Sequence, residues 1–271
     1  MTVISTVFCG LCVAHASDSF ITERQASGTF HILESTKTKI VNVRQWRGAM
    51  AYWGLATHGG WSTWDWLNER ARVANGYASA GEFAVDTAGQ LEKRLRGMRF
   101  ARPTDAGLGI HFSAYERKND YWIPELFLIS NWSDPSYSAL RPNGVSVSRE
   151  TYGTIANEPP SDAHGELEFR LKVHEFLQQG KLLIYNNGDP ALFNPSANGM
   201  ATMFIELARR GLSSQQQDIR KFLAMARRPV EIVANAQQDF CDPGKRIVGG
   251  KPHDLAITPD GLYLSTTGDT D

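Results

Sequence analysis

Residues 2–19 read TVISTVFCGLCVAHASDS, and this stretch decides the fold. Its first half is rich in β-branched side chains, Cys9-Gly10 can turn the chain, and the residues after the turn are again largely apolar. Two short apolar runs joined by a turn are typical of a β-hairpin. We therefore expect the chain to begin with a pair of antiparallel strands.

The hairpin begins with Thr2, a small residue that usually allows the initiator Met1 to be removed. Removal leaves one residue with both a hydroxyl and a free α-amino group. An α-amino group titrates near about 7.7–8.0, so at neutral pH its neutral form can accept the hydroxyl proton. Thr2 is thus a candidate nucleophile that carries its own base.

Beyond the hairpin the hydrophobic pattern predicts strands, two helices, more strands, more helices and a closing hairpin. Two antiparallel sheets packed face to face, each covered by helices, satisfy this order and make the fold α+β. Proline at a first helical position favours a helix that begins at Pro229. The other predicted elements are strand pairs within 30–43 and 108–130, strands at 48–56 and 181–185, helices at 61–74, 82–98, 166–179, 191–210 and 215–227, and a hairpin over 255–265.

Composition excludes several classes of protein. The formal net charge of -1 argues against a nucleic-acid partner, and no apolar run reaches the roughly 18 residues of a membrane helix. Three cysteines make no disulfide framework, so Cys9 and Cys12 are expected to be small buried side chains. The seven histidines are scattered, so no metal or other cofactor is expected. The chain is expected to be one domain over 1–271 with an irregular insertion at about 131–165, which is rich in Ser, Pro, Asn and Asp.

Several segments resemble proteasome β-subunits and related N-terminal-nucleophile (Ntn) hydrolases. The hairpin that leads to Asp18-Ser19 resembles the opening of that family, and the spacing from Thr2 to Asp18 matches it without a gap. STKTKIV at 35–41 is similar to the family's lysine-bearing strand, and GAMAYWG at 48–54 to the segment that crosses its active site. The resemblance covers roughly residues 2–75 and is weaker at Val248-Gly249-Gly250, which resembles the family's Gly-Gly turn. It implies a four-layer αββα sandwich.

The resemblance also implies a role for individual residues. Thr2 is the nucleophile through Oγ1, Lys39 lowers the pKa of its amine and hydroxyl, and Asp18 holds Lys39 charged and oriented. The backbone N–H of Tyr52 donates to the oxyanion of a tetrahedral intermediate. Lys37 is the alternative to Lys39, because the two lie on one face of a strand and a shift of two residues exchanges them.

Two further helper residues of the family, a serine and an aspartate from later loops, have only weak counterparts. Asn187 or Asn186 stands near the position of the serine, and Asp239 or Asp242 near that of the aspartate. This departure leaves open whether the chain is catalytically active.

The implied function is hydrolysis of a peptide or small amide through an acyl-enzyme, in a cytoplasmic protein for which a homo-oligomer remains open. The first alternative is an inactive proteasome-like subunit that acts in binding or assembly. The second is a secreted binding protein cleaved after Ala16, because Ala14-His15-Ala16 has the form of a signal-peptidase site. Against secretion, the first Lys or Arg is Arg24, so no positive region precedes the apolar stretch. No membrane partner is expected.

Overall fold

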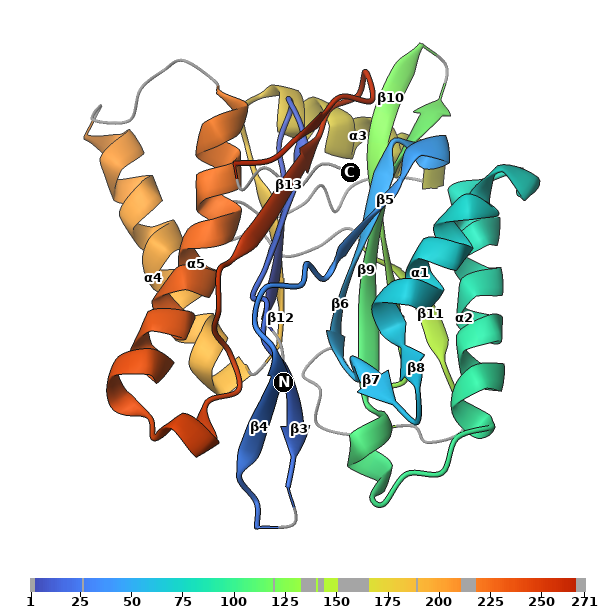
Figure 1. The fold of residues 1–271 in the computed structure, drawn as a ribbon. Coiled ribbons are helices and arrows are strands. Elements are labelled where there is room, and N and C mark those ends of the chain that lie inside the picture. The colour runs from blue at the N-terminus through green and yellow to red at the C-terminus, as the bar shows by residue number, and fades with distance from the viewer. Residues whose placement is uncertain are drawn as a thin grey trace.

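The computed structural model describes residues 3–25, 27–118, 120–132, 140, 144–150, 166–188, 190–210 and 218–266. Within these residues the chain forms two five-stranded antiparallel sheets, two short hairpins and five α-helices. Figure 1 shows the two sheets facing each other, with helices on the outer face of each. The expected mixture of antiparallel sheets and helices is confirmed.

The amino-terminal hairpin lies in the middle of the first sheet. The strand order is β12-β1-β2-β13-β14, so both strands of the hairpin pair with strands from the last third of the chain. Ile4 is opposite Asn187 on one side and Ser17 on the other. The strands of this sheet are β1 (Ile4–Phe8), β2 (Val13–Ser17), β12 (Leu183–Asn187), β13 (His253–Ile257) and β14 (Tyr263–Leu264).

The second sheet is formed mainly from the middle of the chain, in the order β11-β10-β9-β6-β5. Two short hairpins, β3–β4 and β7–β8, stand outside the two sheets. The strands are β5 (Ile40–Val43), β6 (Gly48–Gly54), β9 (Leu108–Lys118), β10 (Tyr121–Ser130) and β11 (Ser146–Glu150), with β3 (Ile21–Arg24), β4 (Phe30–Glu34), β7 (Thr57–His58) and β8 (Trp61–Ser62) in the hairpins.

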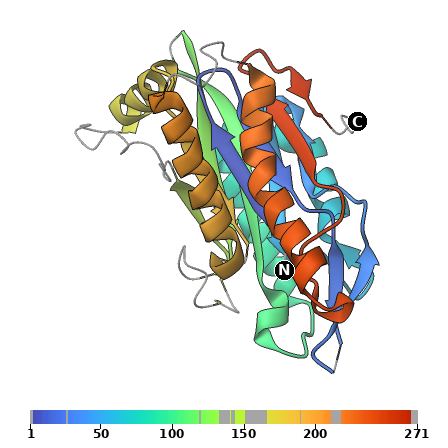
Figure 2. The same ribbon diagram turned by 90° about the vertical axis from the view of Figure 1, so that its left-hand side faces the viewer.

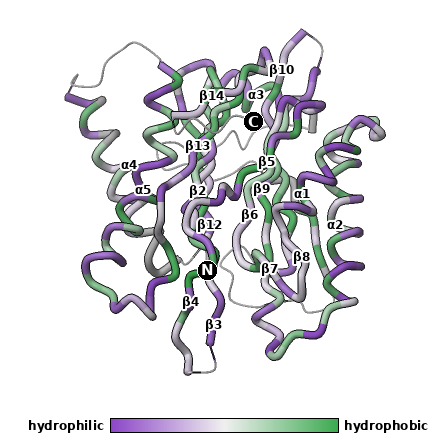
Figure 3. Tube along the Cα trace, in the orientation of Figure 1, coloured by the Kyte–Doolittle hydropathy of each residue, from purple (hydrophilic) through white to green (hydrophobic). Residues whose placement is uncertain are grey.

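Helices α1 (Thr63–Arg72) and α2 (Ala80–Arg96) cover the second sheet, whereas α4 (Pro190–Arg209) and α5 (Ile219–Phe240) lie side by side outside the first (Figures 1 and 2). The remaining helix, α3 (Glu166–Gln178), contacts β10. Hydrophobic and hydrophilic residues alternate along these helices (Figure 3), as expected for helices with one face on a sheet.

Three apolar clusters hold the layers together. Between the sheets, side chains of β1 such as Ile4 and Phe8 meet Ala51 and Trp53 of β6. Outside the first sheet its side chains pack against α5, and outside the second sheet against α1 and α2. Burial of apolar area on both faces of each sheet is the main favourable term for such an arrangement.

Two predicted elements were wrong, and a third lies mostly outside the described residues. Residues 30–43 do not pair with themselves, since β4 pairs with β3 and β5 pairs with β6. Pro229 does not begin a helix but lies inside α5. Its ring is buried on the apolar side of the helix, which packs on the first sheet. The segment 131–165 lies mostly outside the described residues, but it contains β11, which pairs with β10.

Cys9 and Cys12 are buried free thiols, as predicted, with their sulfur atoms 3.6 Å apart. In the part of the chain that the structure describes, no helix is both long enough and apolar enough to cross a membrane.

The close contact between Gly109 and Trp53 gives a test of the packing. These residues are paired across β9 and β6, and a Cβ at Gly109 would lie 1.9 Å from Trp53 Cζ2. We expect Gly109→Ala to lower the free energy of unfolding by about 1–3 kcal/mol, because the indole must leave its position. Gly89→Ala, in an exposed and uncrowded part of α2, should instead raise it by about 0.5–1 kcal/mol. Chemical denaturation measures both, and equal effects would contradict this account.

Candidate active site

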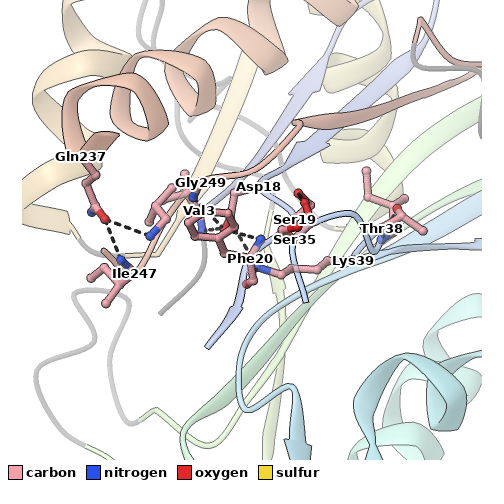
Figure 4. A network of polar contacts seen from close by, with 12 residues as sticks. Val3, Asp18, Ser19, Phe20, Ser35, Thr38, Lys39, Gln237, Ile247 and Gly249 are labelled. Carbon is pink, nitrogen blue, oxygen red and sulfur yellow. Dashed lines mark hydrogen bonds and ion pairs between the residues drawn. The ribbon is translucent and has the colours of Figure 1, made fainter. Parts of the chain in front are cut away.

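The Asp18 carboxylate is the centre of the candidate site and is fully buried. Its Oδ1 accepts a hydrogen bond from the backbone N–H of Val3 and another from Lys39 Nζ, both at 3.0 Å. Its Oδ2 accepts from the N–H of Phe20 at 3.3 Å. Figure 4 shows Val3, Phe20 and Lys39 around Asp18, each from a segment that leads into a different strand.

The position of Asp18 follows from the hairpin register. Because Ile4 is opposite Ser17, the next pair along the two strands is Val3 and Asp18. The N–H of Asp18 donates to the carbonyl oxygen of Val3 at 3.2 Å, which extends the ladder by one residue beyond the strands. The register therefore holds the carboxylate against the start of the chain.

Lys39 is also fully buried and lies one residue before β5. Its Nζ donates to Asp18 Oδ1 and, at 2.6 Å, to the carbonyl oxygen of Phe20. Burial lowers the pKa of the Lys39 ammonium, and the Asp18 charge opposes this change. A buried cation beside one carboxylate can favour the neutral form of a nearby amine.

Lys37 lies elsewhere. Its Nζ is 4.8 Å from the centre of the Trp64 ring, in a cation–π contact, and the side chain is half-buried. The structure thus brings Lys39, and not Lys37, to Asp18.

The carboxyl-terminal part of the chain closes the site from the other side. The N–H of Gly249 approaches Asp18 Oδ2 at 3.5 Å, and the N–H of Ser19 donates to the Gly249 carbonyl oxygen at 3.1 Å. Gly250 has a φ of +75°, and a Cβ there would lie 2.2 Å from Ser19 Oγ. The two glycines are required by this close approach.

Sequence reasoning missed Gln237 of α5, which holds this loop. Its Oε1 accepts from the N–H of Ile247 at 2.7 Å and of Val248 at 3.0 Å (Figure 4). The signal was a polar residue on the apolar face of the helix, at helical spacing from Val230 and Val233, which are both buried.

The Tyr52 N–H, predicted to bind an oxyanion, is engaged inside the sheet. It donates to the carbonyl oxygen of Lys39 at 3.2 Å, next to the β5–β6 ladder. In this arrangement it has no proton left for a substrate. The Tyr52 side chain is fully buried, and burial raises the pKa of its phenol.

The other predicted residues differ in where they lie. Asn187 is buried at the end of β12, opposite Ile4. Asn186, its alternative, is opposite Ser5 and half-buried. By contrast, the alternatives Asp239 and Asp242 are both exposed, and Asp242 pairs with Lys245 at 3.2 Å. Thr2 lies outside the described residues.

Asn187 ends a chain of buried polar side chains that joins the two sheets. Its Nδ2 contacts His111 Nε2, and Thr6 Oγ1 lies 2.9 Å from His111 Nδ1 and 3.0 Å from His15 Nδ1. His15 Nε2 is 2.6 Å from Ser113 Oγ. Burial lowers the pKa of His15 to about 3, and burial together with His15 lowers that of His111.

A cleft of about 570 Å³ lies beside segments that carry the site residues. Thr22, Gly54 and Gly188 line it, and each lies just downstream of a segment that carries Asp18, Tyr52 or Asn187. Phe30, Trp53 and Trp132 give it apolar walls, and its rim includes arginine and acidic side chains. Its size is that of a small-ligand or side-chain pocket. No group of three or more His, Cys, Asp or Glu side chains among the described residues is placed to hold a metal ion.

Comparison with known proteins identifies the fold alone. No protein-family model matches the chain, and no curated protein matches its sequence. Among solved structures the chain is similar to Anbu (ancestral beta-subunit) from Yersinia bercovieri, with a TM-score of 0.52 and 13% sequence identity over 99% of this chain and 88% of that one. The chain thus has a proteasome-like fold.

The two lysines should differ sharply in their effect on stability. Lys39→Met leaves the Asp18 carboxylate buried without its cation, and we expect a loss of about 3–5 kcal/mol in the free energy of unfolding. Lys37→Met removes the contact with Trp64, worth about 0.5–1 kcal/mol, and a charge near the carboxylate of Glu34. Urea denaturation measures both. The double variant Asp18→Asn, Lys39→Met should lose less than the sum of its single changes, and similar losses at Lys37 and Lys39 would refute the pairing.

The buried histidines predict a pH dependence of stability. His15 stays neutral in the folded chain down to a pKa of about 3, whereas in the unfolded chain a histidine takes up a proton below about 6.5. The unfolded state then binds more protons, so the free energy of unfolding should fall as the pH drops through this window, by up to about 1.4 kcal/mol per pH unit for each such histidine.

Urea denaturation between about pH 7 and 5, above most carboxyl titrations, measures this slope. His15→Gln should reduce it, and the exposed His31→Gln is the matched control. An unchanged slope in His15→Gln would contradict the assignment.

Proposed function

We propose that the chain is an Ntn hydrolase of the four-layer αββα type, which cleaves a peptide or small amide with Thr2 as nucleophile. The observation that carries the proposal is the fully buried Lys39–Asp18 pair, whose carboxylate also accepts the N–H of Val3. Val3 is joined to Thr2 by a peptide bond, so the ion pair is anchored beside the start of the chain. A buried ion pair adds little stability by itself, which favours a chemical role.

The proposed reaction begins after Met1 is removed. The α-amine of Thr2 takes the Oγ1 proton, and Oγ1 attacks the carbonyl carbon. When the tetrahedral intermediate collapses, the Thr2 ammonium gives that proton to the leaving amine. Water, activated by the same amine, then hydrolyses the Thr2 ester. The Lys39 ammonium disfavours a second positive charge nearby and favours developing alkoxide, so it holds the amine neutral for this work.

The cleft supports a peptide or small amide as substrate. Its apolar walls can bury the side chain next to the scissile bond, and its arginine and acidic groups can bind polar atoms of the backbone. The proposal includes assembly into a homo-oligomer, which the description of the structural neighbour as a beta-subunit supports. A cytoplasmic location stays a prediction.

Two observations favour the alternative of an inactive subunit that acts in binding or assembly. The Tyr52 N–H, the expected oxyanion donor, is bonded to Lys39, and Asp239 and Asp242 are exposed. The secreted alternative fits the fold poorly, because cleavage after Ala16 would remove β1 and nearly all of β2 from the middle of the first sheet.

Substitution of Thr2 tests the proposal. Thr2→Ala should abolish hydrolysis of a peptide-amide library, whereas Thr2→Ser should keep activity because it retains hydroxyl and amine. An electrophile that needs both groups on one residue should label the wild type at Thr2, as peptide mapping would show. Intact mass reports whether Met1 is removed. Hydrolysis that persists in Thr2→Ala would exclude Thr2 as nucleophile, and a retained Met1 would favour the inactive subunit.

A further inference from the structure

The buried polar side chains between the sheets form a chain of hydrogen bonds, and counting donors and acceptors shows which group donates at each step. It runs through Ser113, His15, Thr6, His111 and Asn187, each in contact with the next. Thr6, His15 and Asn187 belong to the first sheet, and the other two to β9 of the second. All five side chains are buried, so each proton in the chain needs an acceptor.

Both imidazoles are neutral in this environment, because burial lowers the pKa of each. A neutral imidazole has one N–H donor and one acceptor nitrogen. Thr6 Oγ1 lies between two Nδ1 atoms and has a single proton, so it donates to one ring and accepts from the other. Choosing the tautomer of one histidine therefore determines that of the other.

Two directions satisfy the ring nitrogens. In the first direction each group donates to the next, starting from the Asn187 NH₂ and passing through His111, Thr6 and His15 to Ser113. The Ser113 hydroxyl proton is then left over, since Ser113 Oγ has no other hydrogen bond within the described residues. In the other, every step is reversed. Ser113 then donates to His15, and the chain ends with His111 Nε2–H donating to the Asn187 amide oxygen.

In the reversed direction every hydroxyl and ring N–H of the chain has an acceptor, and the donor left over is the Asn187 NH₂. This leftover donor lies at the end next to Gly188 of the cleft, where a substrate oxygen can accept from it, instead of at Ser113 between the sheets. The structure has Asn187 Nδ2 towards His111. A half-turn of the amide exchanges two atoms of nearly equal size and brings the oxygen there.

We propose that Ser113, His15, Thr6 and His111 form a one-way hydrogen-bond chain that holds Asn187 by its amide oxygen and turns its NH₂ away from His111 as a free donor. These four are positioning residues. Asn187 is opposite Ile4 at the end of β12, and the next residue, Gly188, lines the cleft. The role of this donor rests on the proposed function. It binds a carbonyl oxygen or oxyanion of the substrate, in place of the Tyr52 N–H, which donates to the Lys39 carbonyl oxygen.

Nitrogen NMR of histidine-labelled protein reads the direction without any assay of activity. The expected tautomers are Nδ1–H for His15 and Nε2–H for His111, and the opposite pair would overturn the proposal. Signals are assigned with His15→Gln and His111→Gln.

Thr6→Val gives a second, independent reading in a strand position that suits valine. With no acceptor at position 6, His15 should switch to Nε2–H and donate to Ser113, while His111 keeps its tautomer. If His111 switches instead and His15 does not, the chain runs the other way.

Asn187→Asp tests the donor. The carboxylate still accepts from His111, so the tautomers should stay, but the NH₂ is lost. The expected result is a fall in kcat of about 10²–10³, the usual effect of one oxyanion donor, with KM little changed. Asn235→Asp adds the same charge on the exposed side of α5 and is the control. An unchanged kcat would overturn the donor role. If the wild type hydrolyses no substrate, the proposed function is refuted. The histidine tautomers still show in which direction the hydrogen bonds run.

Discussion

The Asp18 carboxylate is the point on which the arrangement of the site depends. It binds the start of β1 through Val3, the residue before β5 through Lys39, and the loop before β13 through Gly249. A buried carboxylate needs several partners to offset the loss of water. The segments that supply them come from both sheets, so the need to satisfy one charge determines how the sheets meet at this end of the molecule.

The polar chain between the sheets gives the same region a second constraint. Most of the layer between the sheets is apolar, and apolar side chains tolerate small displacements. Thr6 tolerates no such displacement, because a slip of β1 by one residue would turn its hydroxyl to the other face of the sheet and separate it from both imidazoles. The same register places Val3 against Asp18, so the histidines and the ion pair support one alignment of β1.

Local pattern and family resemblance were sufficient for the first part of the site. A stretch rich in β-branched residues and a turn indicate the hairpin, and the spacing from Thr2 to Asp18 and the strand at Lys39 led to the ion pair. Pairing was harder to predict. The residues of β4 and β5 look like neighbours in the sequence but pair with β3 and β6, because pairing depends on packing between distant segments. The roles of Gln237 and the Tyr52 N–H depend on contacts across the fold that spacing does not reveal. Asp239 lies in the last turn of α5 and Asp242 just beyond it, because the two helices predicted here form one continuous helix.

The order of the first sheet also affects when the surroundings of Asp18 can form during synthesis. The hairpin has neither of its neighbouring strands until β12 and β13 have been made, and Gly249 follows Asp18 by 231 residues. The nascent chain therefore carries Asp18 without these partners while the intervening residues are being made. The order of synthesis alone would keep the proposed hydrolase inactive until the strands and the loop around Asp18 have been made.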